Sequence, residues 1–136
     1  MMPDFELHPQ LRKDCEEVLD WPLCKVLLMN NALVPWLILV PRVEGVEELH
    51  QLTSQQQYQL LQEVALLSSY LEYTYEPDKL NVAAIGNKVR QLHMHVVARQ
   101  EQDPCWPEPV WGNLASSPYE QTELSALLVQ LRANLA

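Results

Sequence analysis

Positive charge is scarce in this sequence of 136 residues: 9 Lys and Arg residues stand against 18 Asp and Glu residues, and the net charge is −9 at pH 7. Nonspecific binding to nucleic acid depends on Lys and Arg side chains that neutralise phosphates. We therefore expect no nucleic-acid partner, although cations gathered in one place could still bind a small anion.

Cysteine is also sparse, and the three residues Cys15, Cys24 and Cys105 are far apart. They are odd in number, and no pair has the Cys-x-x-Cys spacing. This pattern is typical of reduced thiols in a cytoplasmic protein and excludes a disulfide framework.

Long apolar runs are missing as well. The N-terminus has no basic segment followed by an apolar run, so we predict no signal peptide. The longest apolar stretch, near residues 33–41, is broken by prolines and too short to span a bilayer, so we expect no membrane contact. Repeats and low-complexity segments are absent. With 48% hydrophobic residues, the sequence predicts one globular domain over residues 1–136, with a core at about 5–112.

Hydrophobic periodicity predicts the secondary structure. Helices are expected at residues 9–19, 54–75 and about 118–134, and strands at 24–29, 35–42, 79–85 and 90–98. A capping box would begin the long helix at Ser54, and Ser117-Pro118 would begin the last. The apolar stripe of the long helix is expected to be Tyr58, Leu61, Val64, Ala65, Leu67 and Leu71. These elements predict the α+β class, an antiparallel sheet of about five strands with helices packed on it.

Residues 91–99 alternate between two kinds of side chain. Leu92, Met94, Val96 and Ala98 share one parity, and Gln91, His93, His95, Val97 and Arg99 share the other. Successive side chains of a strand point to opposite faces, so one face is apolar and suits a core. The other face would present an amide, two imidazoles and a guanidinium, with its two histidines ~7 Å apart along the backbone. Such a pair could face a phosphate or a metal ion. Solvated polar residues on an open sheet face are the alternative interpretation.

Residues 86–97 resemble the signature of the histidine triad (HIT) family, in which His-x-His-x-His and two apolar residues follow a glycine-containing turn. The resemblance covers roughly residues 5–112 and is to the bacterial HIT-domain hydrolases. It departs at Gln91, which stands where the first histidine of the triad would be. The resemblance implies a HIT-like fold, a nucleotide substrate, a homodimer and no cofactor.

The resemblance also implies roles for the triad positions. His93 would attack the α-phosphate of a nucleotide and form a nucleotidyl-histidine, and a protonated His95 would stabilise the phosphoryl oxygens. Gln91 can orient the phosphate or the leaving group, but an amide cannot shuttle a proton at neutral pH. We therefore expect either a substrate with a good leaving group or slow turnover. The activity would be that of a nucleoside phosphoramidase or a dinucleoside polyphosphate hydrolase.

Several further residues would contact the substrate by the same resemblance. They are Asn30, Asn81, Gly86, Asn87, Arg99 and Trp106. For Asn30 an ordinary turn residue is the more favoured interpretation. Trp106 belongs to a proline-rich arm, residues 104–112, that is predicted to cover the nucleotide or to reach the partner's site; packing on its own domain is the alternative.

Two other functional classes remain open at this point. The first is a nucleotide-binding module without catalysis, in which Gln91 reflects lost chemistry. The second is a metal site made of His93, His95 and Cys105, which lacks a fourth ligand at a convincing spacing. We expect no metal.

Overall fold

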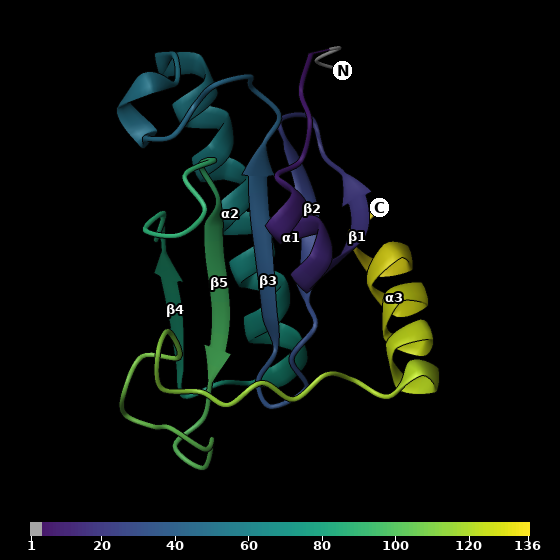
Figure 1. Cartoon of the computed structure of the whole chain (residues 1–136). Helices are drawn as coiled ribbons and strands as arrows, with labels where there is room; N and C mark the ends of the chain where they lie inside the picture. Colours follow the sequence, from purple (N-terminus) through teal and green to yellow (C-terminus); the bar gives the residue numbers. More distant parts are fainter. Residues whose placement is uncertain (1–3) are drawn as a thin grey trace.

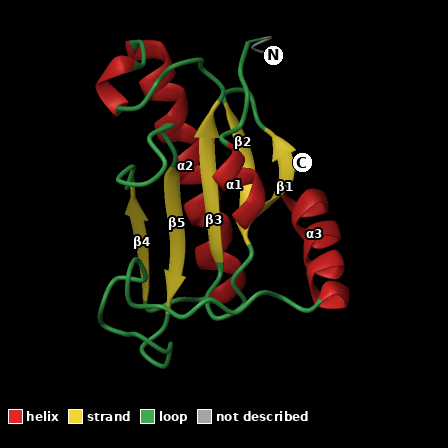
Figure 2. Cartoon of the chain, viewed as in Figure 1, coloured by secondary structure: helices red, strands yellow, loops and turns green. Residues whose placement is uncertain are grey.

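The computed structural model describes residues 4–136, and residues 1–3, part of the N-terminal stretch searched for a signal peptide, lie outside it. The elements follow the order helix, three strands, helices, two strands, helix (Figures 1 and 2). Their bounds are α1 Pro9–Asp14, β1 Cys15–Asp20, β2 Cys24–Met29, β3 Trp36–Pro41, the 3-10 helix η1 Leu49–Gln51, α2 Ser54–Tyr75, β4 Lys79–Ala83, β5 Met94–Arg99 and α3 Gln121–Leu135. Within residues 4–136, no helix combines the length and the apolarity needed to cross a bilayer.

The strands form one antiparallel sheet of five in the order β1-β2-β3-β5-β4, which confirms the predicted α+β class. Strand β5 lies between β3 and β4, with Leu39 opposite Met94 and Val82 opposite Val96. The histidine-bearing strand is therefore an interior strand, held by neighbours on both sides.

The predicted helix at residues 9–19 is wrong in its second half, because α1 ends at Asp14 and strand β1 follows. Cys15 and Val18 are both buried, and their three-residue spacing mimics a helical stripe. In a strand, residues three apart point to opposite faces. Both are buried because Cys15 belongs to the apolar cluster on one face of the sheet and Val18 to the cluster on the other.

Helix α2 has the predicted length but presents a different face to the core. Thr53 caps it, with Gln56 as the reciprocal partner, one residue before the predicted cap. Tyr58 and Leu61, expected in the core, are 65% and 63% exposed. The buried face consists of Leu60, Glu63, Leu67 and Leu71.

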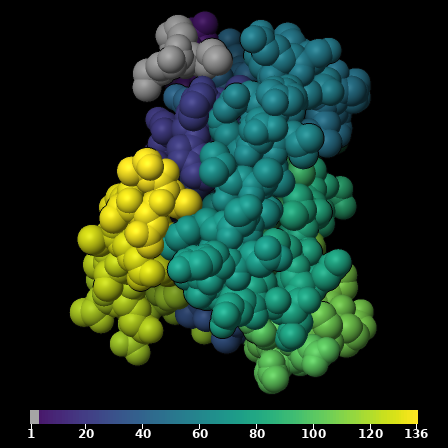
Figure 3. Space-filling model, turned by 180° about the vertical axis from the view of Figure 1, so that it is seen from behind, coloured from purple at the N-terminus to yellow at the C-terminus, as the bar shows by residue number. Residues whose placement is uncertain are grey.

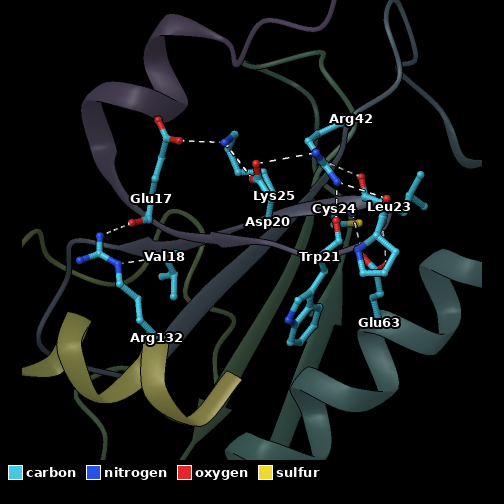
Figure 4. Close-up of polar contacts among 11 residues, drawn as sticks. Glu17, Val18, Asp20, Trp21, Leu23, Cys24, Lys25, Arg42, Glu63 and Arg132 are labelled. Carbon is cyan, nitrogen blue, oxygen red and sulfur yellow. Dashed lines mark hydrogen bonds and ion pairs between the residues drawn. The ribbon is translucent and has the colours of Figure 1, made fainter. Parts of the chain in front are cut away.

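Glu63 is a buried carboxylate that holds the connection between β1 and β2 (Figure 4). Its two oxygens accept hydrogen bonds from the backbone N–H groups of Leu23 and Cys24, both at 2.9 Å. Arg42 extends the same polar cluster by donating to the carbonyls of Trp21 and Leu23. These contacts satisfy polar groups that burial would otherwise make costly.

Helix α3 begins at Gln121, three residues later than predicted, because the segment before it is tied to the end of β2. The N–H of Tyr119 donates to the side chain of Asn30, and the N–H of Ala32 donates to the carbonyl of Ser117. Four of the five predicted apolar residues of α3 are buried: Leu124, Leu128, Leu131 and Leu135.

Both faces of the sheet are covered. Helices α2 and α3 pack on one face, which is the side seen in Figure 3. Helix α1, the segment before it and part of residues 105–114 cover the other, around Leu11, Trp36, Ile38 and Val97. The alternative of a solvated open face is therefore wrong: Trp36, Ile38 and Val97 make this face apolar, and other segments pack on it.

Candidate functional site

His95 lies in β5 and His93 directly precedes it, because the strand begins at Met94, four residues later than predicted. The rings of the two histidines are adjacent. The ring centroids of His93 and His95 are 4.8 Å apart and the planes are tilted by 67°. The two residues are only 5% and 4% exposed. Both imidazoles are therefore held in a position that is largely shielded from solvent.

Within the described part of the chain, one ring nitrogen of His93 has a hydrogen-bond partner and the other has none. Its Nδ1 lies 2.7 Å from the backbone carbonyl of Gln91. A carbonyl can only accept, so Nδ1 carries the proton and Nε2 keeps a lone pair. Burial lowers the pKa of His93, the Gln91 carbonyl opposes this shift, and His8 adds to it. His93 is therefore a neutral imidazole at pH 7, oriented as a nucleophile requires.

His95 is oriented in the opposite sense. The indole N–H of Trp36 donates to Nδ1 of His95 at 3.0 Å, so the proton of the neutral ring is on Nε2. Burial, with a contribution from His93, lowers the pKa of His95 to about 3. His95 therefore offers a neutral N–H donor and not the imidazolium that the sequence analysis expected. A neutral donor can still stabilise an oxyanion.

Trp111 completes the surroundings of His95, and it was not among the residues predicted for the site. Its ring centroid lies 5.1 Å from that of His95 and 6.0 Å from that of Trp36, both edge-to-face. Its buried indole N–H has no hydrogen-bond partner within residues 4–136. The proline-rich arm thus reaches the histidines through its second tryptophan.

Gln91 lies beside the histidines but directs its side chain to the N-terminal segment. Its amide oxygen accepts from the N–H of His8 and its amide nitrogen donates to the carbonyl of Glu6, each at 2.9 Å. Its backbone carbonyl orients His93. Gln91 therefore connects two parts of the chain, a role that spacing along one strand could not reveal.

A cleft of about 460 Å³ opens beside His93. Its lining consists of Glu47, Glu48, residues 84–87 and residues 90–93. Gly86 and Asn87, two predicted substrate contacts, belong to this lining. A Cβ on Gly86 would lie 3.2 Å from the carbonyl oxygen of Val89, so the glycine allows the tight turn at the cleft edge.

Three other predicted substrate contacts gather at the opposite end of β5. Arg99 lies six residues from His93, about 20 Å at the rise of a strand. Its guanidinium donates to Asp103 at 2.7 and 3.1 Å and to Asn81 at 2.9 Å. Trp106 stacks on the same guanidinium at 5.7 Å. Arg99 is 1% exposed, so Arg99, Asn81 and Trp106 form a structural clamp within this chain.

Asn30 and Cys105 are also distant from the histidines. Asn30 follows β2, whose Leu28 pairs with Leu37 and through it with Val96, so Asn30 lies toward the Arg99 end. Cys105 contacts Arg99 at 3.6 Å and is not assembled with His93 and His95 into the alternative metal site. Among residues 4–136, no cluster of three His, Cys, Asp or Glu residues could hold a metal ion.

Comparisons with known proteins agree with this geometry. The HIT domain model matches residues 10–102. A histidine triad protein from Marinobacter aquaeolei is 42% identical, with a TM-score of 0.91 and coverage of 97% of this chain and 98% of that one. A histidine triad protein from Bradyrhizobium japonicum is 41% identical, with a TM-score of 0.92 and coverage of 96% and 98%. One from Sinorhizobium meliloti is 38% identical, with a TM-score of 0.93 and coverage of 98% and 99%. No curated protein matches the sequence.

The matched segment spans more than half of the chain and includes His93 and His95. The three solved structures match the fold of this chain over almost its whole length. The chain belongs to the histidine triad (HIT) family.

Proposed function

We propose that this protein is a nucleotide hydrolase or nucleotidyl transferase that acts at the α-phosphate of its substrate through a nucleotidyl-histidine on His93. Proteins of the HIT family are typically hydrolases or transferases that bind nucleotides. The observation that carries the proposal for this chain is the 2.7 Å contact between Nδ1 of His93 and the Gln91 carbonyl. It leaves Nε2 unprotonated and fixed in direction.

The chemistry follows from the two tautomers. Nε2 of His93 bonds to the α-phosphorus, and the bond from phosphorus to the leaving group breaks, with the electron pair departing on the leaving group. The Nε2–H of His95 donates to a phosphoryl oxygen as charge develops there. Water or another acceptor then attacks the phosphorus and releases His93. Covalent catalysis thus divides one difficult displacement into two easier ones.

Gln91 restricts the substrates, because an amide cannot donate a proton to a poor leaving group at neutral pH. A phosphate leaving group departs as an anion and needs no proton at that moment. Within the proposed function, a dinucleoside polyphosphate or a related nucleotide fits this chain better than a phosphoramidate, whose amine must be protonated. Gly86 and Asn87, at the cleft beside His93, are the proposed substrate contacts.

A nucleotide-binding module without turnover is the alternative, and it is favoured by the same glutamine. Brief incubation with AMP-based substrates followed by mass spectrometry separates the two. We expect an adduct of one adenylyl group on His93 in the wild-type protein and none in His93→Ala. Tight nucleotide binding with neither adduct nor turnover would support the binding module.

We propose further that the protein is a homodimer. Large apolar side chains are exposed on α2, including Leu61 at 63% and Leu66 at 62%, and Val82 on the edge strand β4 is 44% exposed. An edge strand leaves unpaired backbone groups that a second copy can pair. Sedimentation equilibrium at micromolar concentration should give twice the chain mass, and Leu61→Lys should shift it toward the monomer. A wild-type monomer would contradict the dimer.

A further inference from the structure

The N-terminal segment beside Gln91 brings a third histidine to the site. The two hydrogen bonds from the Gln91 amide to the backbone of Glu6 and His8 fix this segment in place. Nδ1 of His8 accepts from the N–H of Gln10 at 3.0 Å, as the cap of α1. In the neutral tautomer that this bond selects, the proton is on Nε2, which has no hydrogen-bond partner among residues 4–136 and can donate to a ligand.

His8 lines a second cleft of about 350 Å³. Its lining consists of His8, Gly45, Val46, Glu47, Lys88, Arg90 and Gln91. Three of these residues, Glu47, Arg90 and Gln91, also line the cleft beside His93. The two clefts are therefore adjacent, with Gln91 at their common wall. His8 also contributes to the lowered pKa of His93.

The second cleft carries local positive charge in an acidic protein. Lys88 and Arg90 are exposed, and within residues 4–136 neither takes part in an ion pair. Glu47 is the one acidic residue of this lining, so two cations face one carboxylate. A cleft with this balance, next to a nucleophile, suits an anionic group joined to the phosphate under attack.

We propose that this second cleft is the leaving-group subsite and that it receives a phosphate-bearing leaving group. The inference rests on the proposed function of His93. The Nε2–H of His8 donates to a non-bridging oxygen of the leaving phosphate, and Lys88 and Arg90 neutralise its charge. As the bond from Nε2 of His93 to phosphorus forms, the bridging bond breaks and its electron pair stays on the leaving phosphate. Gln91 acts as a positioning residue that holds His8 in place.

This assignment gives a physical meaning to the glutamine. A histidine at position 91 would serve leaving groups that need a proton. The glutamine instead uses both of its polar atoms to anchor the segment that carries His8. The site therefore selects its leaving group by charge and hydrogen bonding and not by proton transfer.

Calorimetric titration with two non-reacting ligands tests the subsite without turnover. AMP lacks the leaving group, and α,β-methylene-ADP carries its first phosphate. We expect the wild-type protein to bind α,β-methylene-ADP on the order of tenfold more tightly than AMP, the effect of a hydrogen bond to a charged group. His8→Asn keeps a good helix cap and should reduce the ratio of the two affinities toward one.

His50→Asn is the matched control, because His50 is an exposed histidine on η1 outside both clefts. It should keep the wild-type ratio. An unchanged ratio in His8→Asn, or no binding of either ligand to the wild-type protein, would overturn the subsite. A lost ratio without any adduct on His93 would support the subsite and reject the proposed catalysis. An adduct on His93 with an unchanged affinity ratio would support the proposed catalysis and reject the subsite.

Discussion

Residues 93–99, which consist of His93 and strand β5, carry polar side chains at both ends, and these side chains make different kinds of contact at the two ends. At the Arg99 end, the guanidinium is bonded to Asp103 and Asn81 and covered by Trp106. At the His93 end, each imidazole makes one hydrogen bond within residues 4–136, and its second ring nitrogen has no partner there. Both ends are buried, so burial alone does not distinguish them. The two ends differ in their unpaired ring nitrogens, because these can still form hydrogen bonds with a ligand.

The largest expected effect is the loss of chemistry at one end. His93→Ala removes the nucleophile, and turnover on the best substrate should fall by a factor on the order of 10⁴ or more. Steady-state kinetics measure this. His93 is buried, so circular dichroism and thermal unfolding must accompany the assay. Wild-type activity in this variant would remove His93 from the mechanism.

At the other end, the expected effect falls on stability. In the wild type, the hydrogen bond from Arg99 holds the pKa of the Asp103 carboxyl below its usual value. Arg99→Met leaves that carboxylate without its partner. Breaking a buried pair in this way costs about 3 kcal/mol of unfolding free energy. Urea denaturation should show this loss, while the affinity for AMP in the folded variant stays close to that of the wild type. If the Arg99→Met variant has normal stability but no longer binds AMP, Arg99 contacts the nucleotide and is not a structural residue.

The histidine end should also make stability depend on pH. The pKa of His95 is about 3 in the folded protein, against 6.5 for an ordinary histidine. Between these values the unfolded chain binds more protons, so the unfolding free energy falls as pH drops from 6.5 toward 3. His95→Gln should flatten this dependence in urea denaturation from pH 7 to pH 4. Equal slopes for the two proteins would mean that His95 is not the buried neutral group.

Intrinsic fluorescence can distinguish the two ends, because the arm places one tryptophan at each of them. Trp111 lies beside His95, and Trp106 lies on Arg99. Titration with AMP should change the intrinsic fluorescence saturably, with most of the change lost in Trp111→Phe and retained in Trp106→Phe. The opposite result would support a contact of Trp106 with the nucleotide of the partner subunit.

The smallest expected effect concerns the residue that departs from the triad. Gln91→His supplies a titratable group but removes the amide that holds the His8 segment. We expect turnover to rise modestly for substrates with poor leaving groups and to stay level or fall for phosphate leaving groups. A series of AMP derivatives with graded leaving groups measures this, and an equal change across the series would exclude any role of Gln91 at the leaving group.

Local patterns were sufficient for much of the fold and for the centre of the site. Helix α2, the β2–β3 hairpin and the pairing of β4 with β5 follow from periodicity and turn residues. The alternation at 91–99 overestimated the strand, because β4 ends at Ala83 and β5 begins only at Met94. The β1 strand was missed because apolar residues three apart satisfy either a helix stripe or a strand covered on both faces. The strand becomes distinguishable from a helix only through the packing of α1 and the arm on the sheet face opposite α2 and α3.

The residue types and spacing determined by themselves the HIT signature, the glutamine in it and the chemistry that an amide excludes. Tertiary structure decided which polar atoms remain free. The nearby Gln91 carbonyl and the distant Trp36 indole set the tautomers of the two histidines. Arg99 is bonded to Asp103, four residues on, and to Asn81 on β4. The distant Gln91 side chain holds His8 at the cleft. Hydrogen bonds between residues far apart in the chain leave no periodic trace in a sequence, so they become visible only once the sheet has brought their partners together.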